Sequence, residues 1–232
     1  PDFVDVPVKG LLSKEYARER AALIDMKHAS RVLRAGDPLR FDPDVHAWPF
    51  WVAGGNGTKS DGPEDQAALD ASALKDTTHI AIVDSEGNVF DSTPSGGWIR
   101  GAVILGDTGI GMSVRGEQFW LDRNRAGQIR PRSRPRYTLT PSIVLKDGEP
   151  FLAIGSPGGD NQEQTIVQTL LNIVEFRDDW YPNLHTAIEW PRVQTFHLHG
   201  SFWPHPLGLN QIRIETSVGE AVIEELRALG HD

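Results

Sequence analysis

Two segments of the chain each have the pattern of two short strands joined by a tight turn. β-Branched and other strand-forming residues are frequent in His79–Asp84 and Asn88–Thr93, on either side of a turn at Ser85–Asn88. A second pair, Ser142–Lys146 and Pro150–Ile154, flanks Asp147-Gly148, a dipeptide typical of two-residue hairpin turns. Such strand pairs need helices to cover them, so the pattern predicts a layered α/β (α+β) domain.

Helical periodicity supplies the covering elements. It predicts helices over residues 13–30, 161–176 and from 220 to about 229, and a strand at Gln211–Thr216. Ser13 is suited to cap the first helix, and Ser217 with Glu220 forms a capping-box pattern before the last one.

Composition removes several classes of function. The net charge is −9 with a pI near 5.3, which excludes a broad nucleic-acid surface. We interpret the local Arg-rich run Arg123–Arg136 as a solvated loop. The absence of cysteine excludes disulfides, thiolate metal sites and a cysteine nucleophile. No apolar run approaches the roughly 20 residues of a membrane span.

The composition of the chain changes at about residue 76. Residues 54–75 have the composition of a linker, and the aromatic Trp48, Phe50 and Trp51 before them are more typical of a local anchor than of a binding wall. The sequence begins with Pro1, so we expect the natural start upstream. Whether the protein is cytoplasmic or periplasmic stays open.

Three short stretches at strand ends carry groups that could perform amide chemistry. They are Asp76–His79, Ser92–Gly97 and Gly155–Gly159. A threonine hydroxyl needs a base within hydrogen-bond reach. If the chain were cut before Thr77, its own α-amino group, with a pKa of about 8, could serve as that base. Adjacent glycine amides at the start of a helix are suited to bind an oxyanion.

Together these stretches resemble the γ-glutamyltranspeptidase family of N-terminal-nucleophile hydrolases. Thr77–Asn88 is similar to the start of the family's small subunit, Arg134–Gly148 to a central small-subunit stretch, and Gly155–Gly159 to its oxyanion-hole motif. The order and spacing of all three agree. Residues 1–76 resemble the end of the large subunit plus the connecting linker, and residues 77–232 the small-subunit catalytic region without its last strands.

The resemblance assigns roles to individual residues. It implies autoproteolysis between Asp76 and Thr77, with Thr77 then acting as nucleophile, Ser95 as an assisting hydroxyl, and Gly158 and Gly159 as oxyanion donors. It implies a four-layer αββα sandwich with no metal or organic cofactor. The expected partners are a small N-acyl or γ-glutamyl substrate and the large subunit cut from the same precursor. A homodimer of processed heterodimers is compatible with it, and neither nucleic acid nor membrane is expected.

The resemblance weakens where the family binds its substrate. Glu117, Tyr137 and Thr138 fall at or near substrate-binding positions and are the expected contacts. Phe119 and Trp120 replace carboxylates, and Gly97 replaces an asparagine. Loss of polar partners changes discrimination steeply. We therefore expect an acyl pocket suited to a more apolar or aromatic group than plain γ-glutamyl.

Two alternatives stay open at this point. His197, His199 and His205 could share a metal, although histidines hydrogen bonded within a loop are the more typical outcome. The chain could also be an unprocessed, non-catalytic homologue that acts as a binding module. The sequence favours a self-processing amidohydrolase or acyltransferase.

Overall fold

The computed structural model describes residues 5–46, 77–97, 103–123, 125, 127–176 and 184–232. Asp76, the expected linker at 54–75, and Trp48, Phe50 and Trp51 lie outside this part.

The first predicted hairpin is confirmed. Strand β1 (Ile80–Val83) pairs antiparallel with β2 (Val89–Ser92). The Asp84 carboxylate closes the turn by accepting hydrogen bonds from the amides of Glu86 and Asn88, each at 2.9 Å. Gly87 has a φ of +83°, a conformation that glycine adopts readily.

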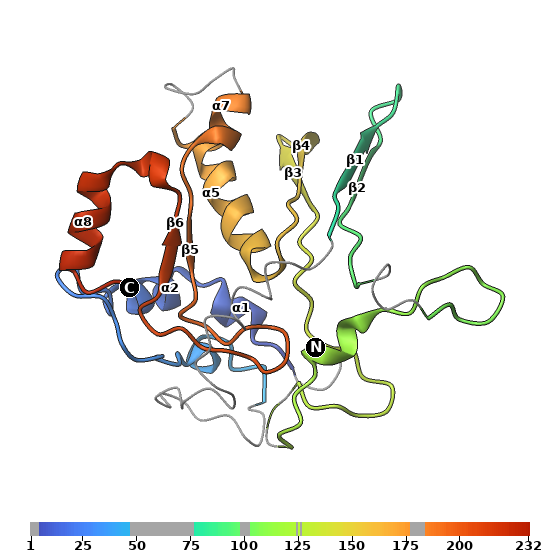
Figure 1. Cartoon of the computed structure of the whole chain (residues 1–232), viewed down its shortest axis with the longest axis horizontal. Coiled ribbons are helices and arrows are strands. Elements are labelled where there is room, and N and C mark those ends of the chain that lie inside the picture. Colours follow the sequence, from blue (N-terminus) through green and yellow to red (C-terminus); the bar gives the residue numbers. More distant parts are fainter. Residues whose placement is uncertain (1–4, 47–76, 98–102, 124, 126, 177–183) are drawn as a thin grey trace.

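The second hairpin is also confirmed. Strand β3 (Ser142–Lys146) pairs antiparallel with β4 (Glu149–Ile154), with a register shift between Val144 and Leu145. Both turn residues have positive φ, +54° at Asp147 and +88° at Gly148, as the twist of a two-residue hairpin turn requires. Strand β2 contacts both β3 and β4, so the two hairpins stand side by side with their tips toward the same end (Figure 1).

Helix α5 (Gln162–Val174) confirms the predicted helix at 161–176 and lies between these hairpins and a third strand pair (Figure 1). Its side chains Ile166 and Ile173 are buried, whereas Val174 is exposed. The side-chain amides of Gln164 and Gln168 bond the backbone of β5 (Val193–Thr195). These bonds attach the helix to the edge of the third sheet.

The third sheet pairs β5 with β6 (Ile212–Ile214), inside the predicted strand at 211–216. Helix α7 (Leu184–Glu189) precedes it and α8 (Glu220–Ala228) follows it. The predicted capping box is wrong: Ser217 lies in a 3₁₀ turn (Thr216–Val218), and Gly219 is the N-cap without a side-chain bond.

The N-terminal region holds two short helices, α1 (Val8–Leu11) and α2 (Lys14–Ala21), and a 3₁₀ turn (Pro38–Phe41). Ser13 caps α2 as predicted, with its hydroxyl accepting from the Tyr16 amide at 3.1 Å. The predicted length to residue 30 is wrong. The Asp25 carboxylate accepts from the Lys27 amide at 2.8 Å, a local bond that competes with helical pairing.

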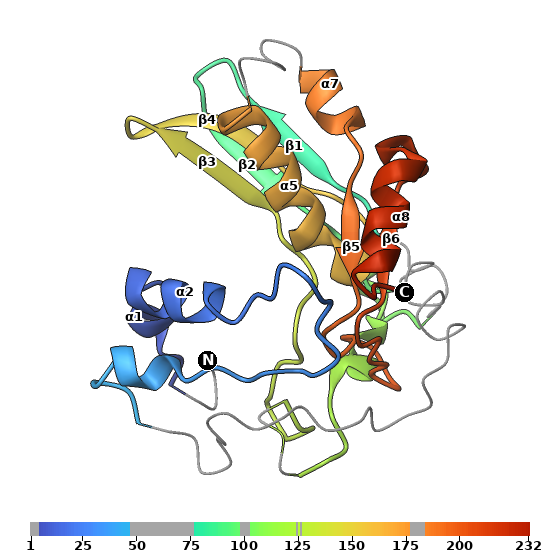
Figure 2. The same cartoon turned by 90° about the vertical axis from the view of Figure 1, so that its left-hand side faces the viewer.

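Among the described residues the strands form three separate two-stranded sheets. The side view shows α5 running alongside both hairpins, as a layered α/β domain requires (Figure 2). The described part therefore confirms the strand-and-helix class, while its sheets are smaller than those of a complete four-layer sandwich.

Candidate active site

Thr77 and Ser95 meet at the base of the first hairpin. An isolated antiparallel bridge joins them and continues the β1–β2 register beyond the strands. The Thr78 amide donates to the Pro94 carbonyl at 3.0 Å, which holds the two ends of the hairpin together. The side-chain oxygens of Thr77 and Ser95 lie 2.8 Å apart, within hydrogen-bond distance. The structure thus brings together the predicted nucleophile and the predicted assisting hydroxyl.

A second polar group lies two residues along the same strand. The Nδ1 of His79 is 3.3 Å from the Thr93 hydroxyl and 3.6 Å from an Asp91 carboxylate oxygen. The Asp91 side chain is only 2% exposed. Burial raises the pKa of Asp91, and the nearby His79 charge opposes that shift. Our sequence reasoning missed this group, although the alternation of Asp91, Thr93 and Ser95 placed all three on one face of a strand.

The Gly155–Gly159 loop begins against His79. A Cβ atom on Gly155 would lie 2.2 Å from His79 Nδ1 and 2.3 Å from Cε1, so the ring fits only because residue 155 is glycine. The loop following β4 is therefore in contact with the strand that leads out of Thr77.

The two predicted oxyanion donors lie where this loop enters α5. Gly158 has a φ of +128° and Gly159 a φ of +58°, and Gly158 caps the 3₁₀ turn (Gly159–Asn161) that runs into the helix. Among the described residues neither glycine amide donates a hydrogen bond. Amides that precede a helix in this way can bind an anion.

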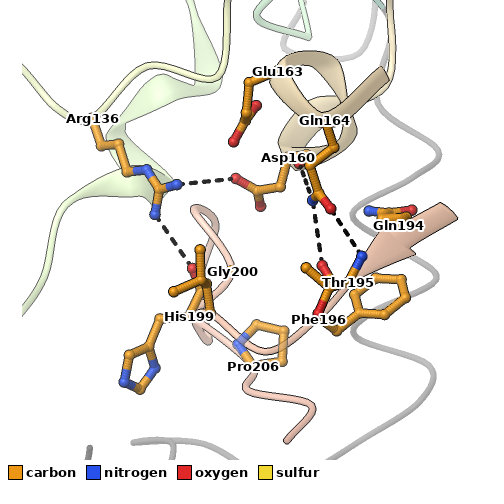
Figure 3. Close-up of a pocket in the computed structure, with 11 residues that line it drawn as sticks. Arg136, Asp160, Glu163, Gln164, Gln194, Thr195, Phe196, His199, Gly200 and Pro206 are labelled. Carbon is orange, nitrogen blue, oxygen red and sulfur yellow. Dashed lines mark hydrogen bonds and ion pairs between the residues drawn. The ribbon is translucent and has the colours of Figure 1, made fainter. Parts of the chain in front are cut away.

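Asp160 directly follows this loop, and its carboxylate lies next to Arg136 (Figure 3). Its carboxylate accepts from the Ser201 amide at 2.8 Å and from the Ser201 hydroxyl, and lies 3.7 Å from Arg136. Arg136 also donates to the His199 carbonyl at 3.3 Å. The hollow beside them has a volume of about 30 Å³, which is enough to hold water.

Glu163 also faces this hollow (Figure 3). Burial raises the pKa of the Glu163 carboxyl. The charge of Asp160 adds to that rise, while a backbone hydrogen bond and Arg136 oppose it. Glu163, Asp160 and Arg136 thus form a partly buried, charged cluster next to the Gly155–Gly159 loop.

The three predicted substrate contacts lie in different environments. Glu117 is exposed, and its backbone carbonyl accepts from the Trp203 amide at 2.8 Å. Tyr137 is 57% exposed. Thr138 is buried, and its hydroxyl accepts from Arg115 at 2.9 Å. The Thr138 hydroxyl therefore already has a partner inside the protein.

Gln162 links Thr138 to the Gly155–Gly159 loop, and a second buried glutamine, Gln118, bonds the Arg115 partner of Thr138. In the amide orientation that satisfies its neighbours, Gln162 donates to the Thr138 carbonyl at 2.9 Å and to the Ser156 carbonyl at 3.1 Å. Gln118 likewise accepts from Arg115 at 3.1 Å. Buried networks of this kind rigidify a site when their members are satisfied.

Gly97, which was expected to replace an asparagine, faces an apolar side chain. A Cβ there would lie 2.7 Å from a methyl of Val114, and the residue has a φ of +69°. Trp120 stacks on His205 with ring centroids 3.8 Å apart, and the Arg125 guanidinium lies 4.2 Å from its ring. Gly97 therefore faces an aliphatic side chain, whereas Trp120 lies between an imidazole and a guanidinium.

The three candidate metal-ligating histidines each lie near backbone groups. His197 faces the Val32 carbonyl at 3.0 Å and the Asn210 amide at 3.0 Å. His199 faces the His205 carbonyl at 3.4 Å. His205 is buried, with its ring nitrogens 2.9 Å from the Gly200 carbonyl and 3.2 Å from the Phe119 carbonyl. The interpretation as hydrogen-bonded loop histidines is confirmed.

Within the described ranges, no group of three or more histidine, aspartate or glutamate side chains is arranged to hold a metal ion. No described helix combines the length and hydrophobicity of a membrane span.

Comparison with known proteins agrees with the fold and the motifs. The glutathione hydrolase proenzyme of Bacillus subtilis subsp. natto is 29% identical over 232 residues, which is all of this chain and 34% of that protein. The Acylase ACY 1 proenzyme of Pseudomonas sp. (strain SE83) is 30% identical over 233 residues, all of this chain and 33% of that protein. The chain therefore spans about a third of the length of these curated relatives.

Solved structures match the fold. LmbA2991T421A superposes with a TM-score of 0.77 at 30% identity, over 98% of this chain and 38% of that one. The cephalosporin acylase from Bacillus halodurans superposes with a TM-score of 0.68 at 24% identity, over 100% of this chain and 33% of that one. The sequence also matches the Gamma-glutamyltranspeptidase family over residues 1–232. With its threonine, hairpins and glycine loop in the order expected of that family, the chain is a divergent member of the gamma-glutamyltranspeptidases.

Proposed function

We propose that this protein is a self-processing N-terminal threonine amidohydrolase or acyltransferase that cleaves an N-acyl amide. The observation that carries the proposal is the 2.8 Å contact between the Thr77 and Ser95 hydroxyls, on a strand that touches the Gly155–Gly159 loop. A nucleophile, an assisting hydroxyl and two oxyanion donors are the groups that such chemistry requires.

Processing comes first. The Thr77 hydroxyl attacks the carbonyl carbon of Asp76, and the peptide C–N bond breaks to leave an ester and a free Thr77 amine. Water then hydrolyses the ester, which releases the Asp76 carboxylate and restores the hydroxyl. Residues 1–76 become the end of the large subunit with its linker, and residues 77–232 belong to the small catalytic subunit. The two subunits would complete a four-layer αββα sandwich.

Turnover uses the same hydroxyl. The Thr77 amine accepts the hydroxyl proton as the oxygen attacks the substrate carbonyl, and the Gly158 and Gly159 amides stabilise the oxyanion. When the tetrahedral intermediate collapses, the proton passes to the leaving amine, the substrate C–N bond breaks and an acyl-enzyme ester forms. Water then gives hydrolysis, or an acceptor amine gives transfer. The Ser95 hydroxyl orients and polarises the nucleophile throughout.

An acyl group more apolar than γ-glutamyl suits this site. Val114 packs against Gly97, where the resemblance places a polar side chain, and one relative of this chain is named an acylase. Glu117, Tyr137 and Thr138 are the proposed substrate contacts, with Phe119 and Trp120 on the acyl side. The partners are a small N-acyl amide and the large subunit of the same precursor.

The test uses purified full-length protein. Mass spectrometry should find a fragment that begins at Thr77, and T77A should remain intact and inactive. Only intact wild-type chain would favour the alternative of a non-catalytic binding module. Rates for γ-glutamyl-p-nitroanilide and for an aryl-acyl p-nitroanilide separate the substrates. Equal or faster turnover of the γ-glutamyl compound would contradict the apolar pocket.

A further inference from the structure

One face of the first hairpin carries a row of polar groups that ends at Thr77. In the β1–β2 register Thr77 faces Ser95 and Ala81 faces Asp91, and between these pairs His79 lies 3.3 Å from the Thr93 hydroxyl. Because side chains alternate along a strand, these groups share one face. The row therefore leads from Asp91, through His79 and Thr93, to the Thr77–Ser95 pair.

Asp91 is unusual for a strand side chain. Its side chain is 2% exposed, and within the described part of the chain neither carboxylate oxygen has a hydrogen bond. Burial of an unbonded carboxylate costs several kcal/mol unless a charge lies close by. The Nδ1 of His79, at 3.6 Å, is the titratable group that acts on Asp91 among the described residues. The carboxylate can therefore influence its surroundings mainly through His79.

His79 in turn touches the Gly155–Gly159 loop. Its ring fills the space that a Cβ on Gly155 would need, with Nδ1 and Cε1 within 2.3 Å of that position. A shift or rotation of the ring would therefore displace either Gly155 or the strand that carries Thr77. Reactions of this type are sensitive to displacements of about 1 Å between the nucleophile and the groups that stabilise charge.

We propose that Asp91 is a positioning residue: it holds the His79 imidazole against Gly155, and His79 thereby fixes the Gly155–Gly159 loop relative to Thr77. The inference rests on the proposed function, because in it Asp91 and His79 set the distance between the Thr77 nucleophile and the oxyanion donors Gly158 and Gly159. Asp91 itself touches neither Thr77 nor substrate.

The contact between Asp91 and His79 should make kcat depend on pH. An ionised Asp91 attracts a His79 imidazolium, whereas a protonated Asp91 does so weakly. Because burial raises the pKa of Asp91, this loss of attraction occurs at a higher pH than for an ordinary aspartate. We therefore expect kcat to fall on the acid side as Asp91 takes up its proton, and D91N to lack that limb.

The experiment compares full-length wild type, D91N and E86Q. Asn is isosteric with Asp, and Glu86 is an exposed carboxylate on the turn of the same hairpin. With an aryl-acyl p-nitroanilide across the pH range, D91N should lower kcat roughly 10- to 100-fold and change KM by less than about threefold. E86Q should behave as wild type. A D91N enzyme with wild-type kcat and pH profile would overturn the proposal.

A second measurement works without turnover, so it separates this proposal from the proposed function. Midpoints of urea unfolding are measured for H79Q in the wild-type and D91N backgrounds above the pKa of Asp91. H79Q should destabilise the wild type more than it destabilises D91N, because it leaves the buried carboxylate without its charge partner. Equal effects in the two backgrounds would show that the residues are uncoupled and would overturn the positioning role. Absence of Thr77-dependent turnover, with coupling intact, would instead count against the enzyme.

Discussion

The hydroxyl oxygens of Thr77 and Ser95 lie 2.8 Å apart across the base of a two-stranded hairpin. A bridge in register with β1 and β2 sets this distance, so the backbone pairing aligns the two hydroxyls. The proposed nucleophile and the proposed assisting hydroxyl therefore both belong to one hairpin, whose own pairing brings them together.

Ser95 should therefore matter through its hydroxyl. S95A removes a hydrogen bond worth about 1 kcal/mol and should slow both processing and turnover by about fivefold. S95T keeps the hydroxyl and should stay within about threefold of wild type. The measurements are the rate at which the Thr77 fragment appears and kcat. Equal rates for S95A and S95T would contradict this role.

Gly155 should tolerate no side chain while His79 is present. G155A places a methyl 2.2 Å from the ring and should destabilise the protein by about 1–3 kcal/mol. G116A is the control, because nothing lies within 4 Å of a Cβ at Gly116. H79A in the G155A background should recover part of the loss. Denaturant unfolding is measured for wild type, G155A, H79A, the double variant and G116A, and additive losses in the double variant would refute the clash.

Thr138 should contribute to stability through Arg115. T138V leaves the buried guanidinium without this acceptor and should cost about 1–3 kcal/mol, whereas T138S keeps the bond. The same variants test substrate contact. An unchanged KM in T138V, measured with a substrate that carries a free carboxylate, would remove Thr138 from the substrate site.

Asp160 should hold the Gly155–Gly159 loop in place. D160A removes the acceptor for Ser201 and the ion pair with Arg136, so we expect a stability loss of about 1.5–3 kcal/mol and a lower kcat. D107A, at an exposed loop position, is the matched control. A D160A protein that unfolds at the same urea concentration as D107A would show that the anchor is dispensable.

Stability should depend on pH through Asp91. Burial raises its pKa in the folded state, so its contribution to stability is fully present below the ordinary aspartate pKa of about 3.9 and is lost as the pH rises through the raised value. Compared with wild type, D91N should thus gain in Tm as the pH rises. Calorimetry from about pH 3 to about pH 8 measures this gain. E163Q should behave similarly, because burial also raises the pKa of Glu163. A constant difference in Tm between D91N and wild type would contradict the expectation.

Local patterns in the sequence predicted the elements that depend on nearby residues. Both hairpins, α5 and the cap at Ser13 formed where expected, because turn dipeptides, strand alternation and helical periodicity act over a few residues. The predicted end of α2 and the predicted cap of α8 were wrong. Polar side chains such as Asp25 and Ser217 can bond in several local ways, and the pattern does not choose among them.

The sequence by itself determined the order of the motifs, the two hairpins and the family, because each depends on residue identity and short spacing. Only the tertiary structure decided what those motifs touch. It placed Gly155 against His79, Asp160 against Ser201 and Thr138 against Arg115, and it buried Asp91 beside an imidazole. Most of these contacts join residues more than twenty positions apart, and all are selected by packing and by the cost of burying polar groups, which no local pattern encodes.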